Sequence, residues 1–150
     1  MNFDSIFEFY YSVFFYALLL VSYLFSAIVE WNIFKKAGEP GWKTLIPFYN
    51  IFVSHHIAGM RHIWFVLEMA VWVVETVLEL VPGIPDWIEN PFTVITFLFT
   101  LISEIVHISM LGDRFGKKTP FKVGMVLLPI VFLPILAFGP AKYQAPEKHA

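Results

Sequence analysis

The stretch Ile63–Val81, IWFVLEMAVWVVETVLELV, is long and apolar enough for a membrane-spanning helix, yet it carries three carboxylates. At about 100° per helical residue, Glu68, Glu75 and Glu79 fall within roughly 40° of one another. The three side chains therefore form one narrow polar stripe on an apolar helix. Because a carboxylate at bilayer depth is costly without a partner or water, the stripe predicts a specific contact for this face.

A second polar stripe occurs in the next apolar segment, residues 92–111. Glu104 and His107 lie about one helical turn apart there. Three threonines continue the same side of the predicted helix: Thr93, Thr96 and Thr100. Two polar stripes on neighbouring helices predict that the helices face each other or a common partner.

Composition sets the class of protein. Of the 150 residues, 58% are hydrophobic and 15% are charged, whereas soluble domains contain about 25% charged residues. The apolar residues collect in long runs, which predicts an all-α integral membrane protein in contact with the lipid bilayer. Residues 1–150 form a single membrane domain, because no linker is long enough to divide them. Basic residues are too few and too dispersed for a nucleic-acid partner, and without cysteine no thiolate site can form.

Four segments predict transmembrane helices, and a shorter one predicts an interfacial or re-entrant helix. The spans are residues 9–34, 63–81, 92–111 and 121–138, and the short helix covers about residues 42–58. The first and third connections carry most of the lysines and arginines, whereas the second carries Asp86 and Glu89. Lys142 and Lys148 in the tail are a counter-signal that the two basic connections outweigh. Since positive loops favour the cytoplasm, both termini are predicted to lie outside. The tail that follows Gly139 and Pro140 is expected to be mobile.

Several short runs carry a family resemblance: KAGEPGW at residues 36–42, LIPFYN at 45–50, RFGK at 114–117 and LLP with a later FG between 127 and 139. They resemble an uncharacterised family of small bacterial multi-span membrane proteins. Members are sometimes labelled signal peptidase I, because similar segments precede that protease domain in some chains. The resemblance implies the bacterial inner (cytoplasmic) membrane and no activity. A mostly apolar chain of 150 residues has no room for the protease domain, so signal peptidase activity is not expected.

The first of these runs also has a direct physical interpretation. Glycines permit the turn, prolines interrupt the helix, Trp42 anchors the membrane interface, and Asn50 can pair with a freed backbone group. The interfacial motif comprises Gly38, Pro40, Gly41, Trp42, Pro47, Tyr49 and Asn50. It can act as a structural re-entrant cap or as the lip of a ligand site.

The polar stripe residues Glu68, Glu75, Glu79, Glu104 and His107 allow three hypotheses. They can seal helices against each other or against a membrane-protein partner, as expected for a non-catalytic accessory or scaffolding subunit of a bacterial membrane complex. They can carry protons or cations across the membrane. The Glu-x-x-His spacing also makes Glu104 and His107 weak metal candidates for a membrane enzyme, but a second such pair is missing. The accessory subunit is the leading prediction, with no catalytic residue, metal or cofactor.

Overall fold

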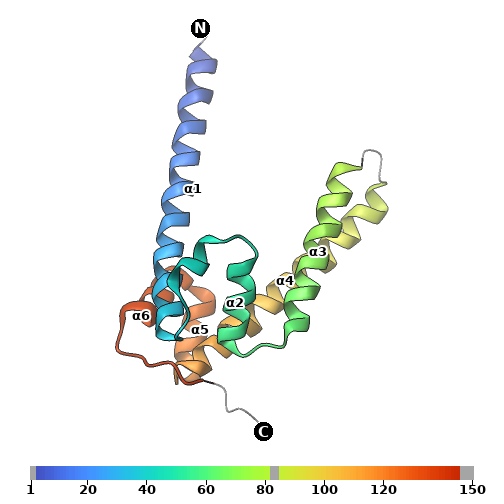
Figure 1. Ribbon diagram of the computed structural model, residues 1–150. Coiled ribbons are helices and arrows are strands. Elements are labelled where there is room, and N and C mark those ends of the chain that lie inside the picture. Colours follow the sequence, from blue (N-terminus) through green and yellow to red (C-terminus); the bar gives the residue numbers. More distant parts are fainter. Residues whose placement is uncertain (1–2, 82–84, 146–150) are drawn as a thin grey trace.

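The computed structural model describes residues 3–81 and 85–145, and every regular element within these ranges is a helix. The elements are α1 (Phe3–Lys36), η1 (Gly41–Leu45), α2 (Tyr49–Ala58), α3 (His62–Leu80), α4 (Asp86–Arg114), α5 (Thr119–Leu127) and α6 (Pro129–Phe138). The helices meet in a packed base, from which two arms extend (Figure 1). One arm is the N-terminal part of α1, and the other is the hairpin of α3 and α4.

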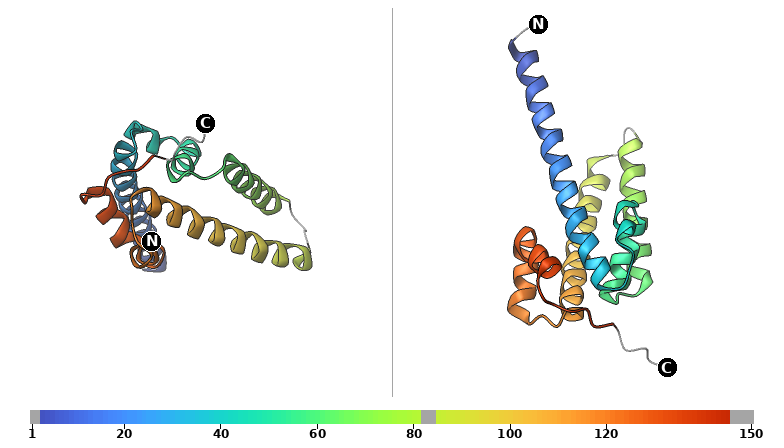
Figure 2. Two further views of the ribbon diagram at one scale, coloured as in Figure 1. Left: turned by 90° about the horizontal axis from the view of Figure 1, so that it is seen from below. Right: turned by 60° about the vertical axis from the view of Figure 1, so that its left-hand side comes forward.

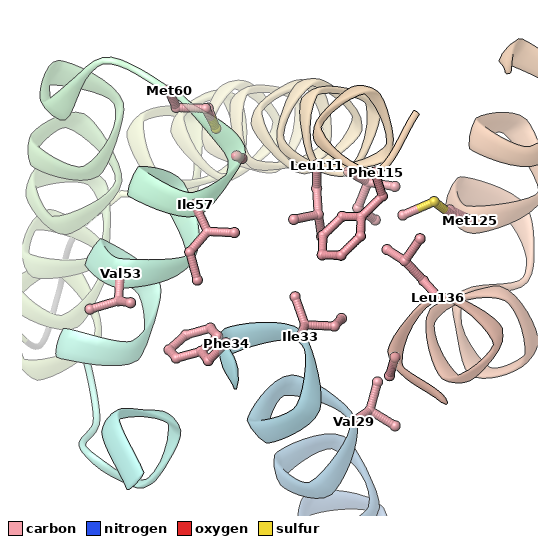
Figure 3. Close-up of a cluster of buried hydrophobic side chains, with 13 residues drawn as sticks. Val29, Ile33, Phe34, Val53, Ile57, Met60, Leu111, Phe115, Met125 and Leu136 are labelled. Carbon is pink, nitrogen blue, oxygen red and sulfur yellow. The ribbon is translucent and has the colours of Figure 1, made fainter. Parts of the chain in front are cut away.

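The hydrophobic core lies in the base. It is formed by the end of α1, by α2, by the end of α4 and by α5 and α6, whose apolar side chains converge (Figure 3). Phe34, Ile57, Met125 and Leu136 are completely or almost completely buried. Each such side chain contributes about 1.5–3 kcal/mol through removal from water. The base is therefore the part of the molecule in which tertiary packing determines the structure.

Lys36, the last residue of α1, fixes that helix to the base. Its Nζ donates hydrogen bonds to the carbonyl oxygens of Leu136 (2.7 Å) and Gly139 (2.6 Å). The last carbonyls of a helix have no donor within the helix, and a positive charge near them is favourable. Lys36 thereby caps α6 and links the end of α1 to the end of α6, about one hundred residues later in the chain.

The end of α2 is closed in a similar way by distant residues. Gly59 ends the helix in the left-handed conformation (φ 81°), and the Nε of Arg114 donates to the oxygen of Ala58 at 3.2 Å. The hydroxyl of Tyr143 donates to the oxygen of Ile57 at 2.9 Å. The expectation of a mobile tail is therefore wrong for the part of the tail that the structure describes, because this part packs against α2.

Among the described residues, two helical stretches are long and apolar enough to cross a membrane: Glu8–Lys36 within α1 and Pro91–Arg114 within α4. The prediction of four transmembrane helices is therefore not confirmed. α3 does form over nearly all of residues 63–81, but its glutamates interrupt the apolar sequence. α4 begins at Asp86, several residues before the predicted span, and includes Pro91.

The segment predicted as the fourth span, residues 121–138, is not one helix. α5 and α6 are separated at Leu128 (φ −136°, ψ 60°), and the rings of Phe121 and Phe132 lie 5.1 Å apart. In a continuous helix these two residues would be separated by about 16 Å. The break has a local cause, because the ring of Pro129 disfavours a helical conformation at Leu128. The segment folds back as a helical hairpin.

This hairpin determines where the segment after α6 lies relative to the start of α1. α1 begins at the tip of one arm, whereas the segment after α6 runs along the base (Figures 1 and 2). The prediction that both termini lie on the same side is therefore not supported. Basic residues stand at the helix ends and connections of the base: Lys35, Lys36, Lys43, Arg61, Arg114, Lys117, Lys118, Lys122 and Lys142.

The segment predicted as an interfacial helix forms η1 and α2, with the interruption at Pro47 as expected. Between them, Phe48 has a positive φ of 62°, which is uncommon for a residue with a Cβ atom. Its ring lies 5.0 Å from that of Trp72 on α3. This contact joins the segment to the arm of α3 and α4.

Candidate functional site

Glu68 is the member of the α3 stripe that contacts the base. Its Oε1 accepts a hydrogen bond from the Oγ of Ser103 on α4. The same oxygen lies 3.5 Å from the Nε2 of His55 on α2. One carboxylate thus joins three helices at the point where the arm leaves the base.

His55 is enclosed, with 5% of its surface exposed, and its Nδ1 has no hydrogen-bond partner among the described residues. Burial lowers the pKa of His55, the nearby Glu68 carboxylate opposes this shift, and His107 adds to it. The neutral imidazole is therefore the favoured form in the folded protein.

His107 on α4 belongs to an adjoining group. Its Nε2 lies 3.0 Å from the Oγ of Ser54 on α2, and its Nδ1 lies 3.8 Å from the Oε2 of Glu104. The ring of His107 meets the ring of His55 edge-on, with centroids 5.1 Å apart. The two histidines thereby connect the Glu68 contact on one side of the base to Glu104 on the other.

A cavity of about 470 Å³ opens beside His107, between α1, α4 and α6. Its walls are mainly apolar, and α1 contributes the half-buried Glu30. The polar residues that line it are Ser22, Ser26, Glu30, Ser54, Glu104 and His107. The dimensions and chemistry are typical of a small-molecule site.

The remaining members of the α3 stripe are not enclosed by the chain. Glu75 is half-buried and Glu79 is exposed, and neither has a hydrogen bond or ion pair with another described residue. On α4, the buried Thr96 donates to the oxygen of Thr93 in its own helix at 3.1 Å. The α3 stripe therefore contacts α4 through Glu68 and Ser103, and Ser103 is not one of the residues of the predicted α4 stripe.

The interfacial motif has mainly structural contacts. Gly38 makes a turn with φ 84°, Gly41 packs directly under the ring of Trp31, and the Oδ1 of Asn50 accepts a hydrogen bond (2.8 Å) from the N–H of Ile51. The motif's other residues are exposed: Pro40, Trp42, Pro47 and Tyr49. None of the seven lines the cavity described above.

The sequence prediction missed Glu30, Ser54, His55 and Ser103 as members of the polar network. Ser103 could have been found, because it lies two helical turns after Thr96 on the same face of α4. The others come from helices that only tertiary packing brings to α4. Among the described residues, no three His, Asp or Glu side chains converge in a way that could hold a metal ion, so the Glu104–His107 pair gains no further ligand there.

Fold and site together define an all-helical protein with a packed base, two apolar arms and a polar network where they join. A family of unknown function, DUF5684, matches residues 42–146, which is more than half of the chain. The protein therefore belongs to this family, as the resemblance to an uncharacterised family predicted. The match does not support the signal peptidase label. No curated protein and no solved structure matches the chain.

Proposed function

We propose that this protein is a membrane-embedded, non-catalytic subunit of a bacterial membrane complex, and that it binds a partner protein through the arm of α3 and α4. Insertion is supported by the exposure of the apolar arms. In the most apolar stretches, 6% of the residues of α1 and 22% of those of α4 are buried. Soluble monomers rarely expose continuous apolar surface on this scale.

The end of α1 supports a retained helix rather than a removable leader. Val29, Ile33 and Phe34 belong to the core, and Lys36 caps α6. Removal of α1 would expose the core and leave the carbonyls of α6 without a donor. The basic residues of the base favour the cytoplasmic side, so α1 begins outside and the segment after α6 lies inside.

Glu75 and Glu79 are the observation that carries the partner proposal. On an apolar arm at bilayer depth, a carboxylate needs a hydrogen-bond donor or a basic group. Among the described residues this chain supplies none to either side chain. A partner helix with basic or hydroxyl side chains at the same depth would supply a donor to each carboxylate.

The first test is purification of the full chain from its native source through a C-terminal tag, in mild detergent, followed by mass analysis of the intact assembly. We expect a stoichiometric partner that is lost in the Glu75→Gln, Glu79→Gln double variant. Thr76→Ala is the matched control, because its Oγ1 already donates to the oxygen of Trp72 in its own helix at 2.8 Å. A wild-type protein that purifies alone would contradict the proposal.

A second candidate function, a proton or cation pathway, is favoured by the series of contacts Glu68–His55–His107–Glu104. Carboxylates and imidazoles can relay protons, and a water would bridge the two rings, because no hydrogen bond joins His55 to His107 among the described residues. Purified protein in liposomes would then conduct, and Glu104→Gln would abolish the flux without changing the folded yield. Absence of flux from wild-type protein contradicts this candidate.

A further inference from the structure

The cavity between α1, α4 and α6 carries an inference that does not depend on a partner protein. Its volume of about 470 Å³ lies within the range of small-molecule sites, roughly 300–1,000 Å³. It lies beside the core, and residues from four helices line it. Its polar and apolar residues indicate which chemical class of ligand it fits.

The charges that line the cavity are acidic. Glu30 comes from α1 and Glu104 from α4, and the described lining residues include no lysine or arginine. His107 is the basic residue there, and both of its ring nitrogens already face Ser54 and Glu104. Glu30 has no hydrogen bond or ion pair with any other described residue. A carboxylate beside apolar walls is unfavourable without a cation or donor.

The serines of α1 provide a second, independent observation. Ser and Thr in a helix often donate to the carbonyl four residues earlier, as Ser12 does here to Glu8 at 2.8 Å. Ser22 and Ser26 lie one turn apart, line the cavity, and make no such bond within the described chain. Their hydroxyl oxygens are thus available to a donor inside the cavity.

We propose that this cavity binds a protonated alkylamine. The ammonium group donates hydrogen bonds to Glu30 and to the serine hydroxyls of α1, and it is attracted by Glu104. The alkyl body packs on the apolar wall, which includes Phe25, Ile130 and Leu133. A free amine fits better than the head group of an aminophospholipid, because the lining, within the part of the chain that the structure describes, offers no lysine or arginine to the phosphate.

The test uses the full chain in a maltoside detergent with octylamine, octan-1-ol and octanoate as probes, measured by calorimetric titration. We expect saturable binding of octylamine and none of the other two. Glu30→Gln should weaken octylamine binding by about tenfold or more, since a charge-assisted contact is lost. Glu8→Gln, at an exposed position of α1 outside the cavity, should leave it unchanged.

Ser26→Ala is a milder second variant in case Glu30→Gln fails to fold, with Ser12→Ala as its control. Only the first should weaken octylamine binding. Equal binding of octylamine and octan-1-ol, or unchanged binding in a folded Glu30→Gln or Ser26→Ala protein, would overturn the proposal.

Nanodiscs distinguish the two sources of an ammonium group. If phosphatidylethanolamine competes with octylamine and phosphatidylcholine does not, the ammonium site is supported with a lipid as its occupant. If neither lipid competes, a free amine is supported. Failure of the partner experiment would not affect these results, because they require only the isolated chain.

Discussion

The base and the arms of this protein are built from similarly apolar sequence, but they differ in what covers their side chains. Phe34 in the base is 1% exposed, whereas Phe14 on the arm of α1 is 69% exposed. Polar groups differ in the same way: Glu68 is paired at the base, and Glu75 lacks a partner within the described chain. The comparison shows that the chain stabilises its own base and leaves the arms to be covered by lipid or by another protein.

The largest expected effect on stability comes from replacing a phenylalanine by alanine in the base, compared with the same substitution in the arm. Phe34→Ala should lower the free energy of unfolding by about 3–5 kcal/mol, because it opens a cavity in the core. Phe14→Ala should change it by no more than about 0.5 kcal/mol, since that side chain is mostly exposed. Chemical unfolding in detergent measures both, and equal losses would remove the distinction between base and arm.

A smaller effect concerns the cap that joins α1 to α6. Lys36→Met keeps the length of the side chain but removes both hydrogen bonds from Nζ, so unfolding should become easier by about 2–3 kcal/mol. Lys35→Met removes a neighbouring exposed charge and should have little effect. Similar thermal midpoints for the two variants would show that the cap does not hold the base together.

The smallest effect is a pH dependence centred on His55. Its pKa is lowered in the folded state by burial, so below pH of about 6.5 the unfolded chain binds the proton more readily. Stability is therefore complete above that pH and is lost as the pH falls, by at most about 1.4 kcal/mol per pH unit. Glu68 and Glu104 favour the protonated ring and reduce the loss.

Unfolding measured between pH 7.5 and 5.5 tests this dependence. His55→Gln should flatten the curve, whereas His56→Gln, at an exposed position of the same helix, should retain it. A wild-type protein that becomes more stable on acidification would contradict the direction of the shift.

Local signals account for what could be predicted. Long apolar runs predicted α1, α3 and α4. Local breakers also act as expected, since η1 ends before Pro47 and α6 ends before Gly139. The same signals predicted residues 121–138 as one span, and this was wrong, because a proline in an apolar segment fits a turn as well as a kinked span. Two long-range interactions stabilise the turn: the contact between the rings of Phe121 and Phe132, and the hydrogen bonds from Lys36 to the end of α6. Neither interaction has a local signature.

The sequence by itself determined the helical class, the apolar character and the stripes of Glu68 and of Glu104 with His107, because these follow from composition and from a period of 3.6 residues. Only the tertiary structure decided which side chains from other helices contact these stripe residues. His55 reaches His107, and Glu30 reaches the same cavity as Glu104, through the packing of helices far apart in the chain. The physical reason for this difference is that the helical period predicts which residues share one face of a helix. Which other helix packs against that face depends on contacts between residues far apart in the chain.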